Sequence, residues 1–201
     1  MLNKRMLLTL IALTMLIVVA QTGYALTPID IKKSQVLWLG TKVTGQHNGT
    51  IQLKSGEVDF TNKKVNSARF VFDMATIKVL DIEDPKWNKK LEGHLKDEDF
   101  FGVNNHPEAV FELSSASPIK GVQETAPNWR FVGDLTIKGI THAVSFDAFV
   151  DIQKNTARAS GEIIVDRTKY GIKYKSGKFF DALGDKAIYD EFEITFDVVT
   201  N

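Results

Sequence analysis

Four histidines are the side chains of this sequence best suited to hold a metal ion, and they lie far apart along the chain. They are His47, His94, His106 and His142, with no HxH or HxxxH spacing among them. Zinc and iron sites need three or four converging nitrogen or oxygen ligands, often including a close pair on one helix or strand. His47 suits a turn, and His94 suits the end of a helix. The spacing therefore predicts no metal site and no metal cofactor.

The segment 166–170, with the sequence Asp-Arg-Thr-Lys-Tyr, is the richest in polar chemistry. Arg167 and Lys169 are candidates for binding an anionic head group, because cationic donors form strong charge-assisted hydrogen bonds with anions. The alternative is a strand end at which Arg167 pairs with a carboxylate on the rim of the fold. The sequence leaves both interpretations open.

Catalysis has no recognisable residue pattern in this chain. The absence of cysteine excludes thiol catalysis and Cys-based metal sites. There is no Gly-x-Ser-x-Gly elbow around a serine nucleophile and no Gly-rich phosphate loop. Acid–base catalysis needs a titratable group within hydrogen-bond reach of the reacting atom, and the inward-facing positions identified below include no Asp, Glu or His. We therefore predict no catalytic residues.

Alternation of apolar and polar residues runs through most of the chain and predicts strands. Its clearest instance is 131–150, where a period of two continues on both sides of a turn at Lys138–Gly139. The expected strands cover residues 36–43, 49–54 with a possible continuation to 60, 67–74, 109–113, 131–138, 143–151, 157–166 and 191–198. Eight such strands can close on themselves without an unpaired edge. The expected fold class is all-β, an eight-stranded antiparallel up-and-down barrel with one short helix.

The helix is expected to begin after Asp84, which can cap its N-terminus, with Pro85 in the first helical position. An apolar stripe follows at helical spacing, formed by Trp87, Leu91, His94 and Leu95. Such a helix can plug one end of a barrel or lie over its outside, and the pattern does not decide between the two.

The interior of such a barrel would combine small and large residues. The small ones are Gly133, Ala148, Ala157, Ala159 and Gly161, and the large ones include Phe111, Phe146 and Phe196. An eight-stranded barrel is wide enough either to be filled by side chains or to hold one small ligand. Both a filled, tapered interior and an elongated apolar cavity remain open.

The N-terminus and the composition indicate an exported protein. Lys4 and Arg5 precede an apolar run over 7–20, which predicts a signal peptide within residues 1–25, cleaved after Ala20 or Ala25. The run is shorter than the roughly 20 residues that span a bilayer. Twenty-five cationic residues balance twenty-five acidic ones, which does not favour nucleic acid as a partner. Residues 26–201 then form one domain.

Seven sequence strings in order carry a family resemblance. They are VLW at 36–38 with KVTGQHNG at 42–49, FDM at 72–74, HLKDEDFF at 94–101, HPEAVF at 106–111, GDLTIKGIT at 133–141 and VDRTKYGI at 165–172. In these strings the chain resembles the YceI family of bacterial periplasmic proteins. The resemblance implies a lipocalin-like barrel whose apolar interior binds a polyisoprenoid, an isoprenoid quinone or another long-chain amphiphilic lipid.

The resemblance and the alternation together nominate a ligand-binding set. It comprises Trp38, Phe72, Phe101, Phe111, Leu135, Phe146, Tyr170, Tyr174, Phe179 and Phe196, with Arg167 and Lys169 at the head group. The expected function is a lipid carrier or storage protein in the periplasm, or a secreted one where no outer membrane exists, with at most transient membrane contact. A filled structural or interaction barrel and, less favoured, an enzyme acting on an isoprenoid lipid are the alternatives. A homodimer is possible.

The segment 166–185 is the expected gate through which a lipid tail passes. Gly171, Gly177 and Gly184 permit changes of backbone angle at little steric cost. Phe179 and Phe180 are expected at the mouth. The competing interpretations are a basic loop packed on the barrel rim and a mouth at the helix near Trp87.

Overall fold

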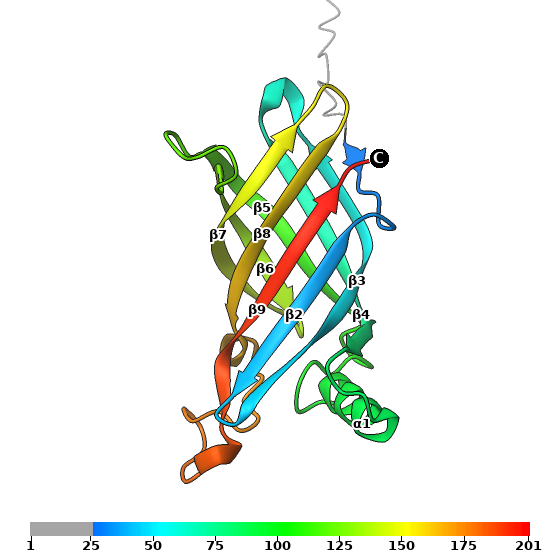
Figure 1. Cartoon of the computed structure of the whole chain (residues 1–201), viewed down its shortest axis with the longest axis vertical. Coiled ribbons are helices and arrows are strands. Elements are labelled where there is room, and N and C mark those ends of the chain that lie inside the picture. The colour runs from blue at the N-terminus through cyan, green and yellow to red at the C-terminus, as the bar shows by residue number, and fades with distance from the viewer. Residues whose placement is uncertain (1–25) are drawn as a thin grey trace, which may run out of the picture.

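The computed structural model describes residues 26–201 and shows a closed antiparallel β-barrel (Figure 1). The predicted signal peptide lies outside the described residues. The barrel strands are β2 (Gln35–Lys42), β3 (Gly45–Asp59), β4 (Ser67–Val79), β5 (Glu108–Pro118), β6 (Trp129–Ile137), β7 (Ile140–Ile152), β8 (Ala157–Asp166) and β9 (Ile188–Val199). A short β1 (Thr27–Pro28) pairs with β3.

The strands follow an up-and-down order that confirms the expected fold class. Each pairs with its neighbour in sequence, and the pairing of β2 with β9 closes the ring. Several strands are longer than the alternation predicts, most clearly β4, which extends to Val79. Register shifts interrupt the β3–β4 and β5–β6 pairings. Because a bulge reverses which residues face inward, the apolar period breaks there while the strand continues.

The two ends of the barrel differ. The lower end, as oriented in Figure 1, is formed by connections 43–44, 80–107, 138–139 and 167–187. It carries α1 (Pro85–Lys96) and the 3-10 turns η2 (Arg167–Tyr170) and η3 (Gly184–Lys186). The upper end is formed by connections 60–66, 119–128 and 153–156 and carries η1 (Thr61–Lys63).

Helix α1 begins as expected from the sequence. The Asp84 carboxylate accepts hydrogen bonds from the backbone N–H groups of Lys86 and Trp87, and Pro85 occupies the first turn. The helix packs beside β4, buries Leu95 and leaves Trp87 exposed. It therefore lies beside β4 at the lower end, with Leu95 packed into the core cluster.

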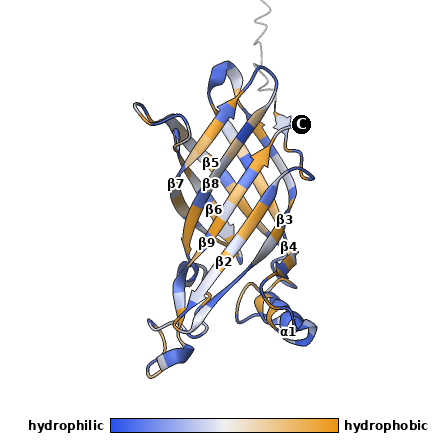
Figure 2. Ribbon diagram, viewed as in Figure 1, coloured by the Kyte–Doolittle hydropathy of each residue, from blue (hydrophilic) through white to orange (hydrophobic). Residues whose placement is uncertain are grey.

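Apolar and polar residues alternate along the strands, as Figure 2 shows, and the apolar set fills much of the interior. Gly133 and Gly161 face large rings. A Cβ on Gly133 would lie 2.5 Å from Cζ of Phe111, and one on Gly161 would lie 3.0 Å from Cζ of Phe196. At these two glycines, phenylalanine rings therefore occupy the space that a larger side chain would need. Within residues 26–201, no helix has the length and apolarity needed to cross a membrane.

Candidate functional site

An elongated apolar cavity with a volume of about 230 Å³ lies inside the barrel. Its wall runs from Ile29 and Val36 near the upper end to Leu95 and Ile172 near the lower end. The non-aromatic apolar side chains that line it include Ile51, Leu53, Met74, Ile77, Leu135 and Ile163. The cavity therefore offers hydrocarbon surface along most of the barrel.

A cluster of phenylalanine rings forms part of the wall of this cavity. Phe146 lies at its centre, with ring centroids 5.6 Å from Phe111, 5.5 Å from Phe131 and 5.7 Å from Phe196. Phe70 extends the cluster through Phe111, at 6.4 Å. Both possibilities left open by the sequence thus coexist, since the interlocked rings form part of the wall of an open apolar cavity.

Seven of the ten nominated ligand-binding residues line the cavity. They are Trp38, Phe72, Phe101, Phe111, Leu135, Phe146 and Phe196. Trp38 also donates a hydrogen bond from Nε1 to the carbonyl of Lys78, at 3.2 Å, which satisfies the polar edge of its ring. Tyr170, Tyr174 and Phe179 lie instead at the lower end, outside the cavity wall. A role in ligand binding remains a prediction for all ten.

Three aromatic contacts lie at the lower end of the barrel. Tyr174 packs edge-on against His94 of α1, with ring centroids 4.7 Å apart, and lies 5.5 Å from Phe100. Tyr170 packs edge-on against His142, at 5.3 Å. These rings join the 167–187 connection to α1 and to β7, so the lower end is closed by packing over much of its area.

Tyr170 is nearly fully buried, at 1% exposure, and its hydroxyl has no hydrogen-bond partner within the described part of the chain. Burial, with a smaller effect of Asp166, raises the pKa of this hydroxyl to about 12. The phenol therefore remains neutral at physiological pH and serves as a packing element.

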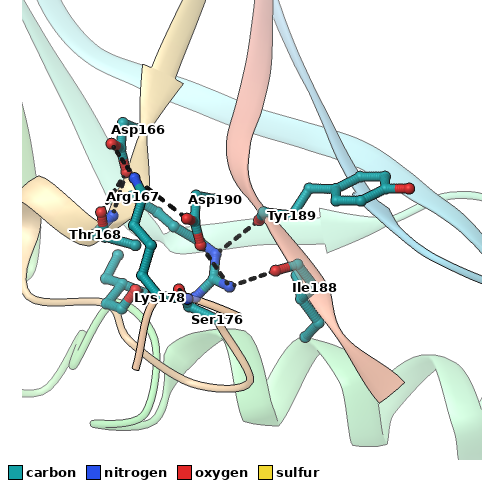
Figure 3. A network of polar contacts seen from close by, with 9 residues as sticks. Asp166, Arg167, Thr168, Ser176, Lys178, Ile188, Tyr189 and Asp190 are labelled. Atoms are coloured by element: carbon teal, nitrogen blue, oxygen red, sulfur yellow. Dashed lines mark hydrogen bonds and ion pairs between the residues drawn. The ribbon is translucent and has the colours of Figure 1, made fainter. Parts of the chain in front are cut away.

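Arg167 fastens the 167–187 connection to the barrel (Figure 3). Its guanidinium donates hydrogen bonds to the backbone carbonyls of Ile172, Ile188 and Tyr189, at 2.9, 2.9 and 3.0 Å. The side chain is buried, and it borders the cavity. Because Ile172 and Ile188 lie on either side of residues 173–187, one side chain holds both ends of that loop.

Acidic groups surround this guanidinium. Asp190 lies 3.8 Å from Nη2 of Arg167, and Nζ of Lys178 bridges Asp166, at 3.0 Å, and Asp190, at 3.2 Å. Burial alone would raise the pKa of Asp166, but hydrogen bonds from Thr168 and Lys178 outweigh it and lower that pKa overall. We call Asp166, Arg167, Lys178 and Asp190 the clasp.

The two head-group candidates are in different surroundings. Arg167 is engaged in the clasp, as the rim-pairing interpretation of the sequence requires, although it also borders the cavity. Lys169 is exposed, and its backbone carbonyl lies 3.0 Å from Nε2 of His142. Head-group binding by either residue remains a prediction.

The pairing of β2 with β9 is irregular in the lower part of the barrel. Gly40 pairs with Phe192, but two residues later Lys42 pairs with Ile188, so β9 contains an extra stretch that β2 does not match. Gly40, Thr41, Tyr189 and Glu191 all line the cavity there, and a Cβ on Gly40 would meet nothing within 4 Å. We call this place the β2–β9 gap.

Two features of the site were missed by sequence reasoning. His142 continues the inward set of β7 two residues before Val144, so extending the alternation would have found it. The β2–β9 gap depends on a pairing irregularity between strands about 150 residues apart, for which the sequence has no local signal.

The histidines occupy separate places. His47 lies 2.8 Å from Asp81, and His94 lies 3.2 Å from Asp99. Among residues 26–201, no group of three or more His, Cys, Asp and Glu side chains is arranged to hold a metal ion.

Comparison with known proteins places this barrel in a family. The model of the YceI-like domain matches residues 28–200. A UPF0312 protein of Staphylococcus aureus is 36% identical over 94 residues, which cover 43% of this chain and 49% of the relative. The chain therefore spans about half the length of the curated relatives it matches.

Two solved structures share the fold. The structure of Burkholderia cenocepacia BcnA superposes with a TM-score of 0.68 at 23% identity, covering 86% of this chain and 99% of that one. A polyisoprenoid binding domain from Saccharophagus degradans superposes with a TM-score of 0.63 at 13% identity, covering 89% and 98%. With the domain match extending over nearly all of the described barrel, the chain belongs to the family of proteins with a YceI-like domain.

Proposed function

We propose that this protein binds a long-chain amphiphilic lipid, of the polyisoprenoid or isoprenoid quinone type, and carries or stores it in the periplasm. The observation that carries the proposal is the apolar cavity along the inside of the closed barrel. Hydrocarbon buried there gains roughly 25 cal/mol for each Å² removed from water. The name of the Saccharophagus degradans domain supports the same class of ligand.

The size of the cavity sets a condition on this function. Its volume of about 230 Å³ is smaller than the roughly 300–1,000 Å³ typical of ligand pockets. A long tail therefore requires the cavity to widen, and we expect rings of the phenylalanine cluster to change rotamer to allow it. Phe146 and Phe196 are placed to do so, because both line the cavity as well as packing in the cluster.

The same cluster is the observation that favours a second candidate, a structural barrel with a filled core. The interlocked rings of Phe111, Phe131, Phe146 and Phe196 are what that candidate requires. The two functions differ in one outcome, since only the lipid-binding barrel retains an extractable lipid.

Mass spectrometry of organic extracts from protein purified without detergent tests the proposal. The expected result is an isoprenoid-type lipid in the wild type and its loss in Ile163→Trp, whose indole would occupy the cavity. Ile164→Trp is the matched control, because Ile164 is the next residue of β8 and is 51% exposed. An extract without lipid, together with failure of the delipidated protein to bind an isoprenoid quinone, would leave the filled barrel as the function.

We place the mouth of the cavity at the β2–β9 gap, beside the predicted gate. Gly40→Leu would narrow the gap without a steric clash, since the space beside Gly40 is open. The expected result is slower uptake of an isoprenoid quinone by the delipidated protein with an unchanged final amount bound. Equal uptake rates in Gly40→Leu and wild type would move the mouth to another part of the barrel.

A further inference from the structure

The tip of the 167–187 connection combines exposed aromatic rings with unpaired cations. Phe179 is 47% exposed and Phe180 is 49% exposed. Residues 167–187 contain six cationic and two acidic side chains, and no acidic residue lies between 167 and 180. Neighbouring exposed phenylalanines are costly in water, so their position at a basic tip calls for a partner that is both apolar and anionic.

The cations of this connection divide into two groups. Arg167 and Lys178 are held by the carboxylates of the clasp. Among the salt bridges of residues 26–201, none involves Lys169, Lys173 or Lys175. These three lysines are therefore available to an external anionic surface.

Cation–π contacts link two of these lysines to aromatic rings of the connection. Nζ of Lys173 lies 4.8 Å from the ring centroid of Phe179, and Nζ of Lys175 lies 5.2 Å from that of Tyr174. The tip is also held in place, because Arg167 binds the carbonyls at both ends of the connection. A tip fixed in this way loses little conformational freedom on binding.

From this arrangement we infer that the tip formed by Lys169, Lys173, Lys175, Phe179 and Phe180 docks on an anionic phospholipid bilayer. The two rings enter the interfacial region while the lysines meet lipid phosphates, as in other basic aromatic membrane-binding segments. Charge complementarity selects this partner over a neutral apolar one. Within residues 26–201, Lys169, Lys173 and Lys175 form no salt bridge, and each would gain a counter-charge at the bilayer.

Docking would bring the cavity to its lipid source, a consequence that rests on the proposed function. Ile188 ends the connection and pairs with Lys42, directly beside the β2–β9 gap. The backbone carbonyl of Tyr189, a residue that lines the gap, accepts a hydrogen bond from Arg167 of the clasp. A tip set into the bilayer therefore places the gap next to the membrane surface, where a tail can pass without crossing bulk water.

Co-sedimentation with vesicles tests the inference. Wild type is expected to bind vesicles of mixed phosphatidylglycerol and phosphatidylcholine and to bind pure phosphatidylcholine weakly. Phe179→Ser/Phe180→Ser is expected to weaken binding at least about tenfold, because half-exposed rings lose their apolar burial. Lys169→Gln/Lys173→Gln/Lys175→Gln is expected to cost about fivefold per lysine at low salt, and high salt is expected to reduce wild-type binding similarly.

The matched control lies at the opposite end of the barrel. Lys64→Gln/Lys120→Gln/Lys154→Gln with Val122→Ser removes as many lysines and an exposed apolar residue from the upper end. Vesicle binding by this variant should equal that of wild type, with circular dichroism confirming the fold of every variant. Absence of wild-type binding, or equal losses in the tip and control variants, would overturn the inference.

The lipid content of the same preparations separates this inference from the proposed function. If the wild type retains an isoprenoid lipid but does not bind anionic vesicles, docking is refuted and the lipid-binding proposal stands. Wild type that binds the vesicles through the tip but holds no lipid would refute lipid binding and leave docking intact.

Discussion

Replacing Phe146 with alanine separates the two possible uses of the barrel interior. The ring contacts three others, at centroid distances of 5.5–5.7 Å. Loss of its burial and of these aromatic pairs is expected to lower the free energy of unfolding of lipid-free protein by about 3–5 kcal/mol. If a lipid tail fills the vacated volume, about 100 Å² of new apolar contact would recover about 2.5 kcal/mol. The loaded variant should therefore lose much less stability than the empty one.

Urea denaturation of delipidated and quinone-loaded protein measures both values. Wild type and Phe146→Ala are each measured empty and loaded, which gives the four values of a thermodynamic cycle. The stabilisation that the bound ligand confers on both proteins then cancels when the effect of the mutation in the loaded state is compared with its effect in the empty state. Ile164→Ala supplies the control, because Ile164 faces outward and its loss should be equal with and without lipid. Equal losses for Phe146→Ala in the two states would show that the tail does not reach the ring cluster, and the reasoning on cavity enlargement would fail.

Three further outcomes follow from the packing and the charges. Gly133→Ala should destabilise the protein by about 1–3 kcal/mol in thermal denaturation, because its Cβ would lie 2.6 Å from the carbonyl oxygen of Glu112 and would also meet the ring of Phe111. Gly93→Ala in α1, where the space is open, should instead stabilise the protein by about 1 kcal/mol. Asp84→Ala should cost about 1 kcal/mol through loss of the α1 cap, read in urea midpoints, and no cost would mean that packing alone fixes the helix start. The lowered pKa of Asp166 gives stability that is present above its unfolded pKa of about 3.9 and is lost as pH falls through the folded pKa. Asp166→Asn should therefore reduce the loss of folding stability at acid pH. An unchanged acid dependence would show that the clasp does not contribute to acid unfolding.

The parts of the fold that were predictable from sequence rest on local regularities. Alternation over 131–150 specifies a hairpin because the same residues that make the pattern also make the contacts. The start of α1 follows from Asp84 and Pro85 alone, since a cap bonds to backbone two and three residues away. Strand ends were underestimated where bulges shift the alternation, as in the upper part of β5.

The site was less accessible for a physical reason. Arg167 binds the carbonyls of Ile172, Ile188 and Tyr189, and a backbone carbonyl has no sequence signature that would identify it as a partner. Whether Gly133 faces an empty space or a ring depends on which residue lies opposite it in the barrel. The alternation of apolar and polar residues does not identify that residue. The choice between cavity and filled core thus required the relative placement of strands.

The clasp has a consequence for how members of this fold can diversify. Arg167 contacts main-chain carbonyls on either side of residues 173–187, and of the side chains between them Tyr174 packs on α1, Ser176 is buried and Lys178 belongs to the clasp. Residues 173–187 other than Tyr174, Ser176 and Lys178 can therefore change in sequence while the barrel beneath keeps its attachment. The tip behaves as an exchangeable module, and a chimera that carries the corresponding tip of another YceI-like protein should acquire that protein's surface preference while retaining the interior of this barrel.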